Sequence, residues 1–356
     1  MCVVPKISHG GRGVTPGMLP RLARRAPTGY PPPMPLLARN ALPAYARLAD
    51  AGVPVLPADA WSGPRLRVGL VNAMADAALE ATERQLLGLL AAAAPDRGVE
   101  LIPAELPEIP RGEAARRHLD AHYEPVADLS RRRLDALIVT GANVPDPDLD
   151  RLPFRAALVR VLDWARDEVP TTLHSCLASH AVLHFRHGRP RRRLAAKRWG
   201  VFPHRVAQPG HPLAHGLADG FVAPHSRWND TPADDCAAAG YEVILQDAED
   251  GGVLLAASPD RRTLLLQGHP EYDPVSLVKE HARETARFLA GERADWPEPP
   301  AGIADAAGLA LLAEHRRRAL AAPAGAPPYP EAALLPHLHH RWRGSAVRIV
   351  GNWLAP

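Results

Sequence analysis

The stretch TTLHSCLASHAVLHF, residues 171–185, carries the clearest indication of the fold. Residues 171–175 form a short run that is typical of a buried strand, and residues 177–185 have the composition of a helix. Cys176 stands between them, so the strand passes directly into the helix. This arrangement predicts a sharp turn at the carboxyl end of a sheet strand, with the cysteine side chain presented at that edge.

The same alternation continues towards the N-terminus. Strands are expected at residues 67–73, 99–102 and 136–140, and helices at residues 77–94 and 154–168. A polar, arginine-rich helical stretch precedes the third of these strands. Strands that alternate with helices predict an α/β fold with a mostly parallel sheet and helices on both faces.

The C-terminal part follows a different pattern. Short strands are expected at residues 242–245, 253–257 and 263–267 with no helix between them, which predicts an antiparallel extension of the sheet. Helices are expected at residues 274–290 and 306–321. The last segment carries two tryptophans and is expected to dock on the body of the protein.

Composition excludes several classes of protein. The 356-residue chain is 46% apolar, which is ordinary for a soluble protein, and its net charge of +3 argues against a nucleic-acid-binding surface. No run approaches the ~20 apolar residues that a membrane-spanning helix needs. The 3 cysteines fit neither a disulfide framework nor a zinc motif, which favours a reducing, cytoplasmic compartment. His337, His339 and His340 lack an adjacent cysteine or carboxylate, and we expect no metal site there.

The chain is expected to have two parts. Residues 1–41 are basic and rich in proline, with no acidic residue before Asp50, and we predict a disordered extension. A misassigned start codon would explain the same composition. Residues 42–356 are expected to form a single catalytic domain.

Three residues suit nucleophilic chemistry at one edge of the predicted sheet. Cys176 opens a helix, and a helix N-terminus favours the thiolate. The backbone N–H of Leu177 is placed to hold an oxyanion. His269 follows the strand expected at residues 263–267, and Glu271 is close enough in sequence to orient its imidazole. We therefore predict that Cys176, His269 and Glu271 are the catalytic residues.

Several short sequence motifs, spread over the chain from residue 42 onwards, match those of one known protein family. They are VNAM at 71–74, DALIVTGA at 135–142, Cys176, Lys197 with GVF at 200–202, APHSR at 223–227, GHPEYD at 268–273, Glu280 with Arg283, and NWL at 352–354. In these motifs the sequence resembles the homoserine O-acyltransferase family of methionine biosynthesis, the MetA-type enzymes. That family is related to class I glutamine amidotransferases, so the resemblance implies their flavodoxin-like fold.

The resemblance also implies a mechanism and its substrates. Cys176 would take the acyl group from acyl-CoA and pass it to L-homoserine in a ping-pong reaction, with His269 as general base and Glu271 holding it. Lys197, Ser226 and Arg283 match the positions that bind the substrate, and Arg283 would bind its carboxylate. His204 and His225 also match and are expected to be structural. No cofactor is implied beyond acyl-CoA as co-substrate, and a homodimer is expected from the family alone.

Departures from the family leave the donor open. Pro145 occupies the position where glycine accompanies succinyl transfer and glutamate accompanies acetyl transfer. An uncharged proline does not repel the succinyl carboxylate, so succinyl-CoA is slightly favoured over acetyl-CoA, although Asp146 and Asp148 lie nearby. The family's proline and lysine after Met74 are replaced by alanine and aspartate. The alternatives are acetyl transfer, a serine acceptor, a glutamine amidotransferase-like hydrolase and an inactive binding homologue.

Overall fold

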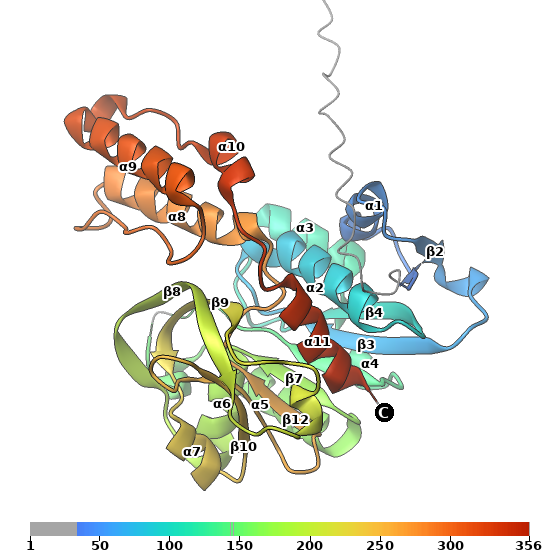
Figure 1. Ribbon diagram of the computed structural model, residues 1–356. Coiled ribbons are helices and arrows are strands. Elements are labelled where there is room, and N and C mark those ends of the chain that lie inside the picture. Colours follow the sequence, from blue (N-terminus) through green and yellow to red (C-terminus); the bar gives the residue numbers. More distant parts are fainter. Residues whose placement is uncertain (1–33, 143, 145, 356) are drawn as a thin grey trace, which may run out of the picture. The chain divides into compact units, whose positions relative to one another are not determined.

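A 12-stranded mixed sheet organises the residues that the computed structural model describes, which are 34–142, 144 and 146–355. The strand order is β2-β1-β4-β3-β6-β7-β12-β11-β10-β8-β9, and the short strand β5 (Glu124–Pro125) pairs with β4 outside this path (Figure 1). Residues 1–33, most of the predicted extension, lie outside the described residues.

The first part of the sheet is parallel, as the alternation of strands and helices predicted. Its neighbouring strands, in spatial order, are β2 (Val55–Pro57), β1 (Leu36–Ala38), β4 (Gly98–Glu105), β3 (Arg65–Val71), β6 (Ala136–Val139), β7 (Thr172–Ser175) and β12 (Thr263–Leu266). Strand β1 lies before residue 42, where we had expected the domain to start. Leu36 and Leu37 are fully buried, so this short segment belongs to the core.

The second part of the sheet is antiparallel, which confirms the predicted extension. It continues from β12 through β11 (Val253–Ala257), β10 (Glu242–Asp247), β8 (Arg192–Val206) and β9 (Phe221–Asp230). The long β8–β9 ribbon was not predicted. Most residues of β8 are partly or fully exposed, so the strand lacks the apolar run that marks a buried one.

Helices cover both faces of the sheet, and the strands feed a core on each side. Along β6, Ala136 and Ile138 join one apolar cluster while Leu137 and Val139 join the other. The first cluster is completed by α1 (Pro43–Asp50), α2 (Leu79–Ala93) and α11 (Arg343–Leu354), and the second by α5 (Arg155–Glu168), α6 (Leu177–His187) and α7 (Ala233–Ala238). This period of two is expected for strands buried on both faces.

A third group of helices stands away from α5, α6 and α7 (Figure 1). It contains α8 (Pro274–Leu289), α9 (Ala306–Ala321) and α10 (Glu331–Leu334), which share a small apolar core that includes the fully buried Trp342. The two remaining helices, α3 (Glu113–His122) and α4 (Val126–Leu129), follow β4 and β5. Helix α8 begins just after the His269 loop, and its position therefore matters for the site.

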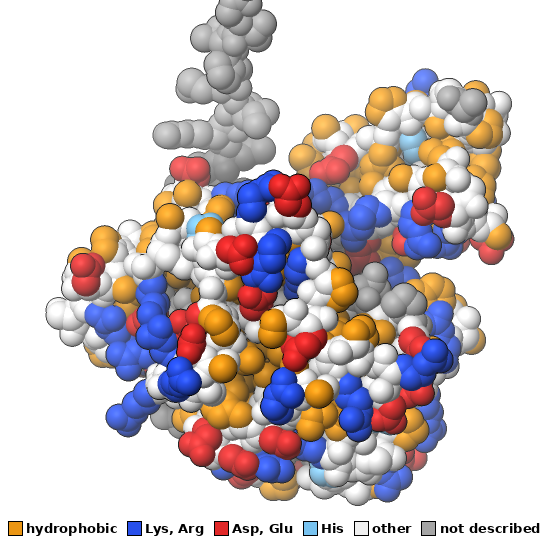
Figure 2. All heavy atoms as spheres, turned by 180° about the vertical axis from the view of Figure 1, so that it is seen from behind, with side chains coloured by type: hydrophobic (Ala, Val, Ile, Leu, Met, Phe, Trp, Pro, Cys, Tyr) orange, Lys and Arg blue, Asp and Glu red, His pale blue; other side chains and the backbone are white. Residues whose placement is uncertain are grey.

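The surface carries charges of both signs. On the face opposite to that of Figure 1, acidic and basic side chains are interspersed and do not gather into one patch (Figure 2). No helix among the described residues is long and apolar enough to span a membrane. The predicted docking of the last segment is confirmed, because α11 buries Trp353 and packs against α2.

Candidate active site

Two neighbouring parallel strands bring the predicted cysteine and histidine together. Strands β7 and β12 pair in parallel with Ser175 opposite Leu266, and Cys176 directly follows β7. The backbone N–H of Cys176 donates to the carbonyl oxygen of Leu266 at 2.7 Å. His269 lies in the loop that leaves β12. Parallel strands end at the same sheet edge, so their following residues meet there.

Cys176 has a strained backbone. Its φ of 50° and ψ of −111° lie in a region that residues with a side chain rarely adopt. Helix α6 begins at the next residue, so the chain reverses direction within one residue. Gly141, two residues after the end of β6, lies against this turn, and a Cβ atom added there would be only 3.0 Å from the Cβ of Cys176. The predicted strand-to-helix elbow is therefore present.

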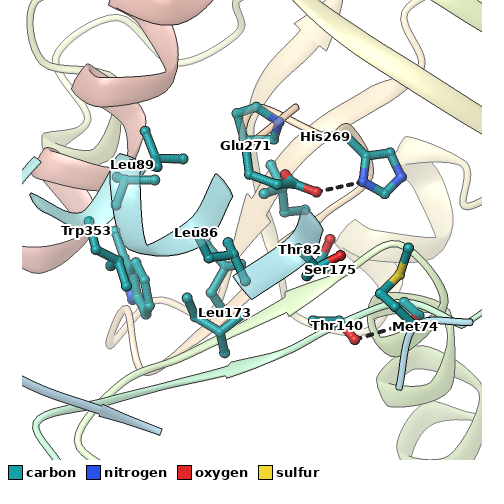
Figure 3. Close-up of a pocket in the computed structure, with 16 residues that line it drawn as sticks. Met74, Thr82, Leu86, Leu89, Thr140, Leu173, Ser175, His269, Glu271 and Trp353 are labelled. Carbon is teal, nitrogen blue, oxygen red and sulfur yellow. Dashed lines mark hydrogen bonds and ion pairs between the residues drawn. The ribbon is translucent and has the colours of Figure 1, made fainter. Parts of the chain in front are cut away.

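The imidazole of His269 is held at Nδ1 and on one face, and it also interacts with the thiol of Cys176. Its Nδ1 donates to Oε1 of Glu271 at 2.9 Å, and its side chain is hydrogen-bonded to the thiol of Cys176. The ring stacks on that of Tyr272 with a centroid distance of 4.5 Å. Figure 3 shows the Glu271 carboxylate directed at the His269 ring. Only 4% of His269 is exposed, so the ring is fixed by packing as well as by hydrogen bonds.

The charges of this cluster favour a thiolate beside an imidazolium. Burial by itself raises the pKa of the Cys176 thiol, but the hydrogen bond and charge of His269 outweigh it, and the pKa lies below its ordinary value. The charge of Arg227 and the N–H of Leu177 act in the same direction. Burial lowers the pKa of His269, yet Glu271 and the thiol raise it well above its ordinary value. Such a pair has the chemistry that a nucleophile and its general base require.

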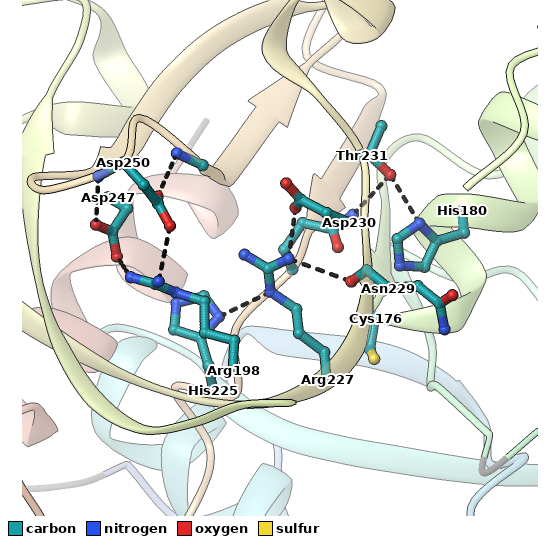
Figure 4. Close-up of polar contacts among 12 residues, drawn as sticks. Cys176, His180, Arg198, His225, Arg227, Asn229, Asp230, Thr231, Asp247 and Asp250 are labelled. Carbon is teal, nitrogen blue, oxygen red and sulfur yellow. Dashed lines mark hydrogen bonds and ion pairs between the residues drawn. The ribbon is translucent and has the colours of Figure 1, made fainter. Parts of the chain in front are cut away.

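Arg227 contacts His225 (Figure 4), and a chain of hydrogen bonds continues from there to the strand β8. Its Nε–H donates to Nδ1 of His225 at 3.3 Å, the two Nε2 atoms of His225 and His204 are 3.0 Å apart, and Nδ1 of His204 lies 2.9 Å from the carbonyl oxygen of Phe202. Each ring therefore donates once and accepts once and is neutral. Both histidines are buried with lowered pKa values, mainly because of burial, so they support Arg227 structurally.

Lys197 and Ser226, two of the predicted substrate-binding residues, both donate to the carboxylate of Glu280. Oε2 of Glu280 accepts from Oγ of Ser226 at 2.6 Å and from Nζ of Lys197 at 3.2 Å. Its Oε1 accepts from the hydroxyl of Tyr272 at 3.0 Å. Burial alone raises the pKa of Glu280, but Lys197 and Ser226 outweigh it and keep the carboxylate ionised. Sequence motifs marked Glu280 without giving it this role.

Arg283 lies on the same helix as Glu280 and is exposed. It makes no hydrogen bond or ion pair with the described residues, so its guanidinium is available to a ligand. Residues three apart on a helix share a face. Pro145, the residue predicted to set acyl specificity, lies outside the described residues.

A pocket extends from the His269 loop into the interior (Figure 3). Its polar lining residues include Thr140, Ser175 and Glu271, and its apolar lining residues include Leu86 and Trp353. The pocket therefore connects the site to the core under α2 and α11. No group of three or more metal-ligating side chains occurs within the described ranges, and His337 instead lies 3.1 Å from the Asp305 carboxylate.

Fold and site together define an α/β protein of the kind that uses a cysteine on a strand-to-helix turn, beside a histidine–carboxylate pair, for covalent acyl chemistry. Residues 35–355 match the model of the homoserine O-succinyltransferase family. This chain belongs to the homoserine O-succinyltransferase family.

Individual relatives agree with this assignment. The homoserine O-succinyltransferase of Allochromatium vinosum is 44% identical over 90% of this chain and 92% of its own length. That of Methylococcus capsulatus is 42% identical over 90% of this chain and 92% of its own length. Among solved structures, a glutamine amidotransferase from Methylobacillus flagellatus has a TM-score of 0.46 at 13% identity and covers 82% of this chain and 93% of its own.

Proposed function

We propose that this protein transfers a succinyl group from succinyl-CoA to the hydroxyl of L-homoserine, the first committed step of methionine biosynthesis. The observation that carries the proposal is the meeting of the Cys176 thiol, the His269 imidazole and the Glu271 carboxylate at one sheet edge. It occurs in a chain whose match to the succinyltransferase family runs from residue 35 to residue 355. The site thus has the reactive groups, and the relatives indicate the substrates.

In the first half of the reaction, the thiolate of Cys176 attacks the thioester carbon of the acyl-CoA. The carbon–sulfur bond to CoA breaks, and the acyl group remains on Cys176 as a new thioester. The departing CoA thiolate takes the proton that His269 holds. We assign the oxyanion to the N–H of Leu177, which already acts on the Cys176 sulfur.

In the second half, homoserine enters and gives its hydroxyl proton to the neutral imidazole of His269. Its oxygen attacks the acyl carbon, and the Cys176 thiolate leaves, which restores the resting pair. The carboxylate of Glu271 stabilises the imidazolium in both halves. The scheme uses acyl-CoA as a co-substrate and calls for no further cofactor.

The cluster around Glu280 suits an amino-acid acceptor, which carries one positive and one negative group. The exposed guanidinium of Arg283 is the group that we assign to the homoserine carboxylate. Lys197 and Ser226 complete the acceptor site, and Glu280 holds both of them in place. Tyr272 touches Glu280 through its hydroxyl and His269 through its ring, so the acceptor cluster adjoins the proposed base.

The donor preference has support from the two aspartates that could have opposed it. The Asp146 carboxylate pairs with Arg151 at 3.4 Å, and the Asp148 carboxylate accepts from the N–H of Asp150 at 2.9 Å. The ion pair and the hydrogen bond offset part of the negative charge of these two side chains. They therefore repel the distal carboxylate of succinyl-CoA less strongly. A cytoplasmic location and a homodimer are further proposals that rest on the family alone.

A panel of substrates tests this function. Purified protein is incubated with succinyl-CoA or acetyl-CoA and with homoserine or serine, and CoA release and acylated product are measured. We expect O-succinylhomoserine as the main product, and none from the Cys176→Ala variant. Faster acetyl transfer or a preference for serine would correct the donor or the acceptor. Ammonia release from glutamine without acyl transfer would replace the proposal by the amidotransferase-like alternative.

A further inference from the structure

Arg227 acts on the candidate nucleophile and Arg198 acts on Arg227, and both of these arginines have acidic partners. Arg227 pairs with Asp230. Arg198 pairs with Asp247 and Asp250. An ion pair of this kind neutralises the arginine and leaves it little attraction for a charged substrate. Any cation left unpaired near Cys176 is therefore of interest.

Arg191 is such a cation. It lies between α6 and β8 and makes no ion pair with the described residues. Its Nε–H donates to the carbonyl oxygen of Pro147 at 3.0 Å, and its Nη2 donates to the carbonyl oxygen of Asp146. The Asp146 carboxylate itself pairs with Arg151, and its charge acts on Arg191 without forming an ion pair with it. The two carbonyl bonds fix the guanidinium but do not neutralise it, and no described residue accepts from Nη1.

Arg191 is also close to the first turn of α6. Its charge acts on the thiol of Cys176 and on His180, which are both at the N-terminal end of that helix. Arg191 contacts Asp146 and Pro147, and Gly141, five residues before Asp146, touches the Cys176 turn. The charge interaction brings Cys176 within the electrostatic reach of this cation, and the two hydrogen bonds fix the guanidinium on Asp146 and Pro147, in the segment that follows Gly141.

Leaving this cation unpaired has a cost. The side chain is partly buried, and burial is the main cause that lowers its pKa below the ordinary arginine value. A partly buried cation without a counter-ion is unfavourable, and binding of an anion offsets this cost. The rigid fork of N–H groups on a guanidinium suits a carboxylate in particular. The site is therefore prepared for an anionic group of the substrate.

We propose that Arg191 binds the distal carboxylate of the donor's acyl group and thereby selects a succinyl over an uncharged acyl chain. This inference rests on the proposed function, because it assumes acylation of Cys176 by a CoA thioester. Succinyl-CoA carries that carboxylate at the far end of its four-carbon acyl chain. Butyryl-CoA has a chain of the same length without the charge, and acetyl-CoA has neither.

Donor selectivity in the Arg191→Gln variant tests the proposal. The kcat/KM values for succinyl-CoA and butyryl-CoA are measured with saturating homoserine, and acylation of Cys176 is followed by mass spectrometry without homoserine. We expect the succinyl-to-butyryl ratio of kcat/KM to fall by about 10- to 100-fold, the range for a lost hydrogen bond to a charged group. Arg191→Lys, which keeps the charge but loses the fork, is expected to lie in between and substitutes if the first variant does not fold.

Arg193→Gln is the matched control. It removes one positive charge two residues away, where the guanidinium lies over the Trp228 ring at 4.5 Å, and it should leave the donor ratio unchanged. An equal loss for both donors, with a higher pH midpoint for alkylation of Cys176, would overturn the proposal, because Arg191 would then serve the thiolate alone. An unchanged ratio would overturn it as well. Absence of any acyl transfer by the wild-type protein would instead refute the proposed function.

Discussion

His269 links the cluster of Cys176 and Glu271 to the cluster around Glu280. Glu271 holds one ring nitrogen, the Cys176 thiol interacts with the side chain through a hydrogen bond and charge, and Tyr272 covers one face of the ring. The hydroxyl of Tyr272 continues the contact to Glu280, which holds Lys197 and Ser226, the proposed acceptor-binding pair. The geometry of the proposed base is thus coupled to the geometry of the acceptor site through one aromatic side chain.

The lowered pKa of Cys176 has a measurable consequence. The thiolate persists to lower pH than in free cysteine, so the rate of alkylation by iodoacetamide should stay high until the pH falls below the lowered pKa. His269→Asn removes the largest cause of the lowering and should move the midpoint upwards. The internal reference is Cys236, which is buried with a pKa raised to about 12 and should not react. An unchanged midpoint in His269→Asn would contradict this account.

Glu280 is predicted to act on the acceptor and not on the donor. Glu280→Gln removes the charge that fixes Lys197 and Ser226. The KM for homoserine should rise by about 10-fold or more, as expected for a lost charged hydrogen bond. The rate of Cys176 acylation by succinyl-CoA, measured by rapid quench without homoserine, should stay close to that of the wild type. A comparable loss in acylation would show that Glu280 serves the triad instead.

At the scale of elements, the sequence predicted what the parallel strands determine. Strands β7 and β12 were recognisable as buried runs, and their common edge follows from parallel pairing, which is why the Cys176–His269–Glu271 cluster could be anticipated. The β8–β9 ribbon could not, because its residues are mostly exposed and its register shifts between Arg193 and Arg198. The partners of Lys197 and Arg227 depend on that register and became visible only in the fold.

Strand β8 also contains a glycine that the packing requires. Gly200 has a φ of 138°, and a Cβ atom added there would lie 2.4 Å from backbone atoms of Ala301. Gly200→Ala should therefore lower the free energy of unfolding by about 2 kcal/mol or more. Gly188→Ala, at the C-terminal cap of α6, has a positive φ but nothing within 4 Å, and should cost only about 1 kcal/mol. Urea denaturation measures both, and equal effects would refute the role of the close contact.

At the scale of the whole molecule, the fold buries several neutral histidines. His174 and His180 have pKa values lowered to about 3, and that of His204 is lowered to about 4, in each case mainly by burial. These histidines lie in β7, α6 and β8, so their burial depends on the folding of the sheet and of its covering helix together. Histidines in the unfolded chain titrate near pH 6.5.

Acid should therefore destabilise the folded protein well above the range in which carboxylates titrate. Below pH 6.5 the unfolded chain binds protons that the folded chain does not, so this contribution to stability is full above that value and is lost as the pH falls towards the folded-state values of about 3 to 4. His269, with its raised pKa, opposes the trend by one proton. We expect the free energy of unfolding to fall by roughly 3 kcal/mol or more between pH 7 and pH 5. Equal urea midpoints at the two pH values would contradict this prediction.

The central claim is that Cys176 carries the acyl group. The most direct measurement is the intact mass of the protein after incubation with succinyl-CoA alone, followed by peptide mapping. The account predicts the added mass of one succinyl group on Cys176, and its loss with formation of O-succinylhomoserine when homoserine is added. Product formation by Cys176→Ala, or turnover by the wild type with the adduct never detected on Cys176 under rapid quench, would contradict it.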